Sequence, residues 1–300
     1  MKSKGLSSYG IILAIIGIIL FSAKAVLVKL AYKFDISSEH LLLFRMLFSL
    51  PVYIVLALYN KPVQKENIKK IDYVWILFFG FVGYYLASYF DFLGLQYIKA
   101  GLERIILFVY PTLVIIISRV FLRNKITNRQ LFAILLTYIG VIITFWGEIH
   151  TETDHLILGV LLIFLSALTY ATYLIGSGWL IPKFGVVSFT SYAMIVSSIC
   201  IIIQYLVFDR QDIFNYPTEL YVICIIMAIF STIIPSYLVS AAIAKLGASN
   251  FSIIASLGPV STIVLAYVFL GENLSVIQII GAVVVIFGIY IVSRKNKVLT

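Results

Sequence analysis

Residues 97–130 read YIKAGLERIILFVYPTLVIIISRVFLRNKITNRQ, and they align without a gap on residues 245–278, KLGASNFSIIASLGPVSTIVLAYVFLGENLSVIQ. The offset between the two stretches is constant at 148 residues, from 97 to 245. Identical residues fall at this offset in both copies: Pro111 and Pro259, the VFL runs at 120–122 and 268–270, and Gln130 and Gln278. The chain is therefore interpreted as an internal duplication, with one unit at 1–148 and the other at 149–300.

The composition is that of a membrane protein. Of the 300 residues, 62% are hydrophobic and only 12% are charged, and the mean hydropathy is +1.08. A soluble domain carries about one quarter charged residues and does not bury so much apolar surface. The net charge of +9 comes largely from basic residues in short segments between apolar runs. This pattern sets membrane topology and does not indicate a nucleic-acid partner.

Apolar runs bounded by polar clusters predict ten membrane-spanning helices of about 20 residues each. The expected spans are 9–31, 39–59, 73–95, 100–122, 128–147, 157–180, 187–208, 219–243, 247–270 and 274–293. The first run is longer than the roughly 7–15 apolar residues of a signal-peptide core, so we expect it to be retained as a helix.

Lys and Arg are distributed unevenly between the connecting segments. If the N-terminus is cytoplasmic, the outer segments carry only Lys33, Lys99 and Arg210, and the remaining basic residues of the connections lie inside. The positive-inside rule therefore predicts that both termini are cytoplasmic. A unit of five helices crosses the bilayer an odd number of times, so its copy enters from the opposite side. The fold class expected is thus all-α, with ten transmembrane helices in two inverted five-helix repeats.

The second copy carries the clearest resemblance to a known family. Its segment PVSTIVLAYVFLGENLSVIQIIGAVVVIFG, at 259–288, and Arg45 early in the second expected helix resemble the EamA-type branch of the drug/metabolite transporter superfamily. The first copy departs from the pattern, because RN stands at 123–124 where the second copy has GE at 271–272. The resemblance covers nearly the whole chain.

This resemblance implies ten helices around a central cavity that is lined mainly by the first, third, fourth, sixth, eighth and ninth helices. It also implies export of small metabolites, such as amino acids, across a bacterial cytoplasmic membrane. Members that import their substrate have the same construction, so the direction of transport stays open.

Five ionisable residues lie within the outer halves of the expected spans: Lys24, Arg45, Asp91, Glu103 and Arg104. An ionisable side chain at membrane depth costs about 2.5–3.5 kcal/mol and usually faces a partner or a wet cavity. We therefore expect an ion-pair network centred on Asp91 and Glu103, with Arg45 as a structural charge near the outer interface. The alternative is that these residues snorkel or pair structurally, without binding substrate or coupling its transport.

Neutral polar residues complete the candidate site. Spacings of four and three place Tyr84 and Ser88 on the helical face of Asp91, and Tyr110 falls on the same face as Glu103. The offset of 148 pairs the charged positions from 91 to 104 with uncharged residues, so charge is confined to the first half. The second half offers stacking and hydrogen-bonding groups: Tyr170, Tyr173, Ser236, Tyr237, Asn250 and Ser252. For the aromatic members, core packing is the alternative interpretation.

Three prolines fall inside apolar runs, at Pro111, Pro235 and Pro259. Each removes a backbone hydrogen bond and disfavours helical geometry at the preceding residue. At mid-membrane such positions serve as hinges or expose carbonyl groups to a ligand, and the alternative is a simple packing kink.

These observations predict a secondary transporter, an exporter of amino-acid-like or other small organic solutes that works by alternating access. A proton is the candidate coupling ion, and the lipid bilayer is the other expected partner. The chain has no glycine-rich phosphate loop, His-Glu-x-x-His helix or nucleophile elbow, so we expect no enzymatic activity, cofactor or metal. An importer of the same construction, or a membrane enzyme or scaffold without transport activity, is the alternative. The oligomeric state is not indicated.

Overall fold

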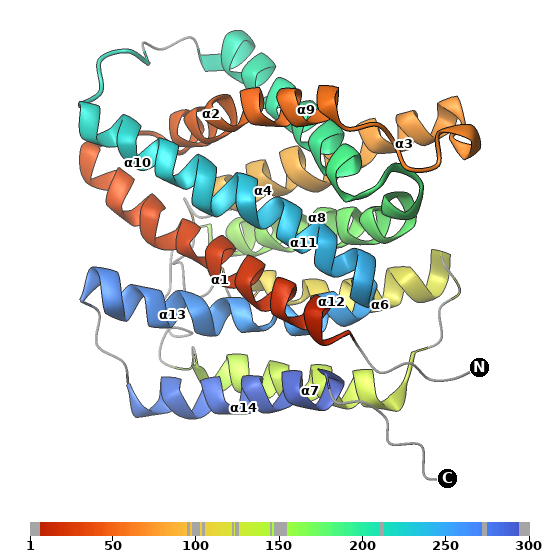
Figure 1. The fold of residues 1–300 in the computed structure, drawn as a ribbon. Helices are drawn as coiled ribbons and strands as arrows, with labels where there is room; N and C mark the ends of the chain where they lie inside the picture. The colour runs from red at the N-terminus through yellow and green to blue at the C-terminus, as the bar shows by residue number, and fades with distance from the viewer. Residues whose placement is uncertain are drawn as a thin grey trace.

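The regular structure of this protein is helical in every part of the chain that its computed structural model describes (Figure 1). The described residues are 7–94, 97, 103, 106–121, 123, 126–144, 146, 155–209, 213–271 and 275–293. The helices of the first half are α1 (Ser8–Ala31), η1 (Tyr32–Phe34), α2 (Ser38–Tyr59), η2 (Lys65–Asn67), α3 (Lys70–Gly80), η3 (Phe81–Leu86), α4 (Ala87–Gly94), α6 (Tyr110–Phe121) and α7 (Asn128–Thr144). Those of the second half are α8 (Leu156–Phe184), α9 (Val186–Gln204), η5 (Tyr205–Asp209), α10 (Thr218–Ala228), η6 (Ile229–Ile233), α11 (Ile234–Leu246), α12 (Ala248–Ile254), α13 (Leu257–Leu270) and α14 (Val276–Ser293).

Seven helical segments of the described chain are long and apolar enough to cross a membrane: Ser8–Phe34, Ser38–Tyr59, Lys70–Gly94, Leu156–Phe184, Val186–Phe208, Thr218–Leu246 and Ala248–Phe269. Each coincides with one of the expected spans. The other three expected spans correspond to shorter apolar helices of 10–17 residues, at Tyr110–Phe121, Asn128–Ile143 and Val276–Val292. The prediction of an all-helical integral membrane protein is confirmed.

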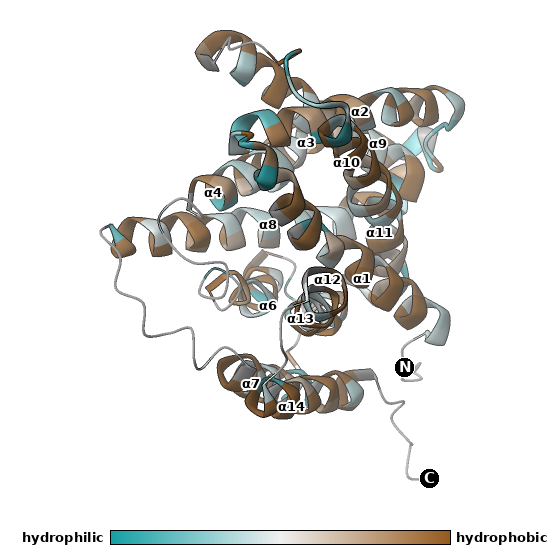
Figure 2. Ribbon diagram, turned by 90° about the vertical axis from the view of Figure 1, so that its left-hand side faces the viewer, coloured by the Kyte–Doolittle hydropathy of each residue, from teal (hydrophilic) through white to brown (hydrophobic). Residues whose placement is uncertain are grey.

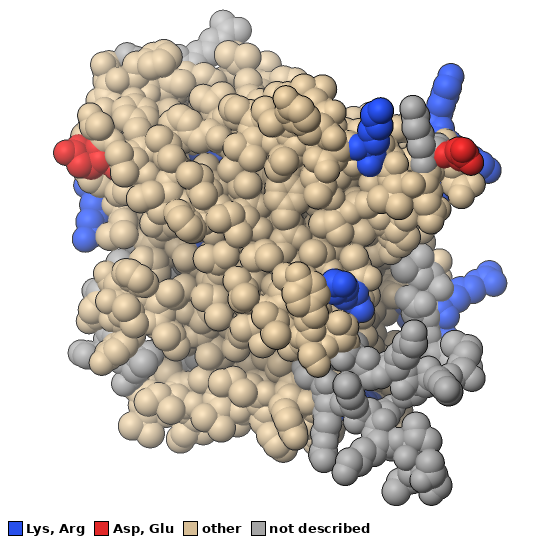
Figure 3. All heavy atoms as spheres, in the orientation of Figure 1, with Lys and Arg blue, Asp and Glu red and all other residues tan. Residues whose placement is uncertain are grey.

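The outer surface of the helices is apolar along most of its length (Figure 2). On the pair formed by α7 and α14, Leu135 is 57% exposed and Val283 is 60% exposed. Charged side chains lie toward the ends of the helices and leave the broad middle of the visible face almost uncharged (Figure 3). Such a surface is expensive in water but matches the hydrocarbon core of a bilayer.

The helix boundaries repeat at the offset found in the sequence. The first residues of α2 and α9, of α3 and α10, and of α7 and α14 are each separated by 148 positions. The π-helical segments η3 and η6 also begin 148 residues apart, in the middle of equivalent spans. A π-helical turn costs regular hydrogen bonding, so its recurrence in both halves marks a shared feature of the two units.

The two halves are packed into each other. Helix α1 lies against α11 and α13 of the second half, while α8 lies against α4 and α6 of the first. Helices α7 and α14 pair side by side at the bottom of the view in Figure 1. The interior between the halves therefore takes its side chains from both units.

Glycines allow two abrupt reversals in the second half. Gly185 separates α8 from α9 at φ +80°, and Gly247 separates α11 from α12 at φ +78°. Only glycine adopts such angles readily, so each reversal takes a single residue. At the same end of the bundle, Lys183 Nζ lies 2.8 Å from Asp72 Oδ1 and ties the end of α8 to the start of α3.

Candidate functional site

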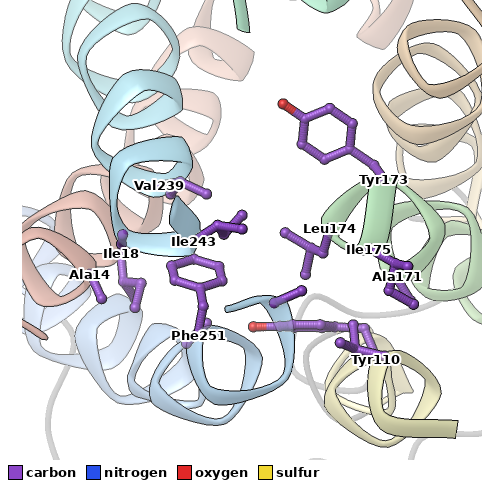
Figure 4. Close-up of a cluster of buried hydrophobic side chains, with 14 of the residues drawn as sticks. Ala14, Ile18, Tyr110, Ala171, Tyr173, Leu174, Ile175, Val239, Ile243 and Phe251 are labelled. Atoms are coloured by element: carbon purple, nitrogen blue, oxygen red, sulfur yellow. The ribbon is translucent and has the colours of Figure 1, made fainter. Parts of the chain in front are cut away.

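A cavity of about 160 Å³ lies in the interior between the two halves. First-half residues on its wall are Ile18, Phe21, Ser22, Lys24, Arg45, Gly83, Tyr84, Ala87, Ser88, Asp91, Leu107, Phe108 and Tyr110. Second-half residues on its wall are Ser166, Tyr170, Val239, Phe251, Ala255, Gly258 and Pro259. Figure 4 shows part of this region, where Tyr110 of α6 points toward Phe251 of α12, and Ile18 and Val239 of α1 and α11 lie near Phe251.

The wall of the cavity is built from equivalent positions of the two halves. Five of its residue pairs are separated by the offset of 148: Ile18 and Ser166, Ser22 and Tyr170, Asp91 and Val239, Leu107 and Ala255, and Tyr110 and Gly258. The interior therefore draws matching sequence positions from both units. The cavity is thus a property of the paired halves and not of either half alone.

An ion pair forms one side of the cavity. Lys24 Nζ of α1 lies 3.5 Å from Asp91 Oδ2 of α4, and the Asp91 side chain is 7% exposed. Asp91 Oδ1 is also buried, and no described residue gives it a hydrogen bond. One oxygen of the carboxylate therefore faces Lys24, and the other is buried without a donor among the described residues.

Arg45 lies beside this pair. The sequence favoured a structural charge near the outer interface, but Arg45 is only 3% exposed and lines the cavity. Its guanidinium donates a hydrogen bond to Ser88 Oγ at 3.2 Å, whereas its Nε is buried with no acceptor among the described residues. A structural role for Arg45 therefore stays a prediction, and its place on the cavity wall was not expected, because distance along the helix from its start does not reveal which neighbours cover a side chain.

Three tyrosines, Tyr84, Tyr110 and Tyr170, line the cavity, and Tyr173 packs against two of them. The ring of Tyr110 meets the ring of Tyr170 edge to face at 5.5 Å, and Tyr84 meets Tyr173 edge to face at 4.7 Å. Tyr170 and Tyr173 stack at 6.4 Å, which joins the two pairs into one cluster. Edge-to-face contacts of this kind hold rings in defined orientations, so the wall is rigid and aromatic.

The π-helical segment η3 carries Tyr84 to this cluster. The residue before it, Gly83, approaches α8 so closely that a Cβ atom there would lie 2.0 Å from Cβ of Tyr173. Glycine is thus required for α8 and η3 to touch. Segments with π-helical bonding are frequent at functional sites, where they re-aim a side chain without ending the helix.

The prolines lie at interruptions of the helices. Residues 255 and 256 separate α12 from α13 just before Pro259, which lines the cavity. Pro111 follows a similar interruption at 108 and 109, where Tyr138 Oη donates to the carbonyl of Val109 at 3.3 Å. Pro235 stands at the start of α11, directly after the π-helical segment η6.

Two charged candidates from the first half, Glu103 and Arg104, are not seen at the described part of the cavity wall. Glu103 is buried at 1% exposure and is not among the described residues that line the cavity. Arg104 lies outside the described residues. Of the residues expected in the ion-pair network, Lys24 and Asp91 are in contact.

Four candidates from the second half take part in hydrogen bonds between and within helices. Ser236 Oγ and Tyr53 Oη are 3.0 Å apart, and Ser191 Oγ and Tyr237 Oη are 2.7 Å apart. Asn250 accepts from Gln130 at 3.0 Å, and Ser252 donates to the carbonyl of Ser249 at 2.9 Å. None of the four lines the cavity.

Sequence reasoning missed two hydroxyl groups of the wall. Ser22 Oγ donates to the carbonyl of Gly258 at 3.1 Å, and Ser166 Oγ donates to the carbonyl of Ala87 at 2.8 Å. Each bond joins a helix of one half to a helix of the other. A serine within an apolar run looks like a packing residue; the available signal was that Ser166 lies one helical turn before Tyr170 and faces the same way.

These features define a helical membrane protein with a buried, partly charged cavity at the junction of two related units. The EamA-like transporter family matches residues 8–146 and again residues 157–294, so the chain belongs to this family and is a membrane transporter. The membership that the sequence suggested is confirmed.

Similar proteins agree with this assignment. The chain is 29% identical over 284 residues to the "Uncharacterized transporter YcbK" of Bacillus subtilis, covering 93% of this chain and 91% of that one. It is 27% identical over 247 residues to an "Uncharacterized transporter" of Archaeoglobus fulgidus, covering 82% and 84%. A protein of known crystal structure superposes with a TM-score of 0.76 over 95% of this chain and 96% of the other. Its sequence identity is 14%, so this likeness concerns the fold alone.

Proposed function

We propose that this protein is a secondary transporter that moves small organic solutes by alternating access and binds them in the central cavity. The observation that carries the proposal is the cavity wall, which pairs equivalent positions of the two halves around a buried ion pair. In such transporters the substrate lies where the halves meet, because rocking one half against the other opens the site to each side in turn.

The proposed architecture is two inverted repeats of five transmembrane helices, 1–148 and 149–300, with both termini in the cytoplasm of a bacterial cell. The common offset of 148 in the helix starts supports it, as does the double match to one family. The short apolar helices α6, α7 and α14 supply the spans beyond the seven long ones. The interruptions before Pro111 and Pro259 are the proposed hinges.

The walls of the cavity indicate the kind of solute. Arg45 offers an unused donor at Nε, and Asp91 offers an unused acceptor at Oδ1. A zwitterion satisfies both, with its carboxylate at Arg45 and its ammonium group at Asp91. A cavity of about 150 Å³ holds a molecule the size of benzene, so the observed volume suits a small amino-acid-like solute beside the tyrosine cluster.

Export is the proposed direction, with a proton as the coupling ion and Asp91 as the group that carries it. During the proposed cycle the Asp91 carboxylate contacts Lys24 in one state and the substrate in another. Proton coupling requires such a change in the environment of the group that carries the proton. Import by the same machinery is the second candidate, because the direction of flux follows the gradients.

Flux into proteoliposomes under an imposed pH gradient tests the function, with a panel of labelled amino acids as probes. We expect the gradient to raise the initial rate for at least one probe. Asp91→Asn removes this stimulation, whereas Glu219→Gln, at an exposed carboxylate in the first turn of α10, leaves it unchanged. Flux that ignores every gradient contradicts the proposal; loss of thermal stability with unchanged transport in Asp91→Asn assigns Asp91 a structural role.

A further inference from the structure

A second cavity, of about 370 Å³, lies at one end of the bundle. It is lined by residues at the N-terminal end of α2 and by residues of α4, the C-terminal part of α9 and η5. These residues are Ser37, Ser38, Glu39, Leu42, Tyr89, Phe92, Leu93, Ile201, Gln204, Tyr205 and Phe208. Because it is formed by helix ends and includes the exposed Glu39, we refer to it as the vestibule.

The vestibule and the central cavity share two helices. On α2, Leu42 faces the vestibule and Arg45, one turn later, faces the central cavity. On α4, Asp91 faces the central cavity and its neighbour Phe92 faces the vestibule. Leu42 and Phe92 are thus the vestibule residues that neighbour central-cavity residues along both helices, and we call these two residues the layer between the spaces.

Phe92 is the member of this layer that touches the charges of the central cavity. Its ring centroid lies 5.7 Å from Lys24 Nζ and 5.9 Å from the guanidinium carbon of Arg45, and the residue is 6% exposed. Two cations on one aromatic ring hold it in place electrostatically, more firmly where water is excluded. The same two cations form the wall that meets the solute.

We propose that the vestibule is the entrance to the central cavity and that Phe92 is the gate between them. With the ring in its observed position, a polar solute has no wet route between the two spaces. An anionic group at Lys24 and Arg45 competes with the ring for their charge, so occupancy of the cavity weakens the contacts that keep the gate closed. This inference rests on the proposed transport through the cavity and adds the route and the residue that controls it.

Cysteine accessibility tests the gate without any substrate. In a background with Cys200→Ala and Cys224→Ala, Ser22→Cys reports on the central cavity and Ser38→Cys reports on the vestibule. The full-length protein is reconstituted in proteoliposomes, and a membrane-impermeant thiosulfonate is added to each side separately. The side from which Ser38→Cys reacts defines the vestibule side, so no assumption about orientation is needed.

Phe92→Ala removes the ring, and Phe90→Ala, on the same helix α4 but lining neither cavity, is the matched control. We expect Phe92→Ala to raise the modification rate at Ser22→Cys from the vestibule side by about tenfold or more, and Phe90→Ala to change it by no more than about twofold. Phe92→Leu keeps most of the packing and is expected to give an intermediate increase in the modification rate. It replaces Phe92→Ala as the test of the gate if Phe92→Ala does not fold. A rate that is equal in the Phe92 and Phe90 variants, or that rises only from the opposite side, overturns the proposal.

The outcome is separate from that of the flux experiment. If gradient-driven flux is observed but Phe92→Ala leaves labelling unchanged, the transport proposal stands and the route through the vestibule is wrong. If labelling rises as expected but no solute is moved, the gate is real and the proposed function fails.

Discussion

Lys24 and Asp91 belong to different helices, and the structure places them in contact inside an apolar bundle. A charge without a partner at this depth is costly, while a paired charge offsets much of its desolvation. The pair spans 3.5 Å and leaves one carboxylate oxygen unused, so it is a looser contact than the pair of Lys183 and Asp72 at 2.8 Å. A binding site needs a polar atom that can still form a hydrogen bond to the ligand, whereas a purely structural ion pair does not.

The pair is expected to respond differently to single and double neutralisation. Lys24→Met leaves the Asp91 carboxylate buried without its cation, which lowers the stability of the detergent-solubilised protein by about 1–3 kcal/mol. Combining it with Asp91→Leu removes both charges and restores most of that stability, because a buried pair contributes little beyond an apolar contact. Thermal unfolding followed by the loss of monodisperse protein measures both effects. Transport stays absent in the double variant; recovery of flux would show that the pair has no role in binding.

At the scale of helices, the π-helical segment η3 decides how closely the halves approach. Gly83 permits contact with α8, and the next residue, Tyr84, enters the tyrosine cluster. The equivalent segment η6 precedes Pro235 at the start of α11. Both irregular segments lie in the middle of their spans. There the regular α-helical hydrogen bonds are replaced by π-helical ones, which changes the direction of the side chains.

Gly83→Ala is expected to destabilise the protein, because the added methyl group meets Cβ of Tyr173 at 2.0 Å and neither helix can yield easily. Overpacking of this kind costs about 1–3 kcal/mol. Gly178→Ala on α8 is the matched control, since its new Cβ finds its nearest neighbour at an ordinary 3.5 Å from Cβ of Ala248. The control should be neutral or gain up to about 1 kcal/mol from helix propensity. Equal melting temperatures for the two variants would refute the close contact at Gly83.

At the scale of the whole molecule, each half completes the interior of the other. Helices α1 and α8 are equivalent by the offset of 148, and each packs against helices of the opposite half.

The proposed even number of crossings predicts that both ends of the chain lie in the cytoplasm. A reporter that is fluorescent only in the cytoplasm should therefore be active at either terminus. An alkaline phosphatase that needs the periplasm should be inactive at both. A fusion after Phe34, which follows one crossing, is the positive control for the outer side. Opposite results at the two termini would mean an odd number of spans and would exclude the inverted pair.

Some features of the site could be read from the sequence because they depend on local spacing. Tyr84, Ser88 and Asp91 were expected on one face, and all three line the cavity. The sequence could not distinguish these cavity-lining residues from Ser236, Tyr237 and Asn250. A hydroxyl or amide group in an apolar helix can bind a ligand or a neighbouring helix equally well. Each of these last three residues has a side-chain hydrogen-bond partner 46–183 residues away in the chain, and only the packing reveals that partner.

By itself, the sequence determined the helical membrane class, the positions of the long spans, the duplication at 148 residues and the family. These follow from apolar run length, charge distribution and local identity, which act over short distances along the chain. Only the tertiary structure decided that Arg45 is buried beside Ser88, that Lys24 is the partner of Asp91 and that Phe92 lines the vestibule within reach of two cations of the central cavity. The physical reason is that a side chain's environment in a bundle is set by the helices packed against it, and that packing depends on the rotation and close approach of both halves.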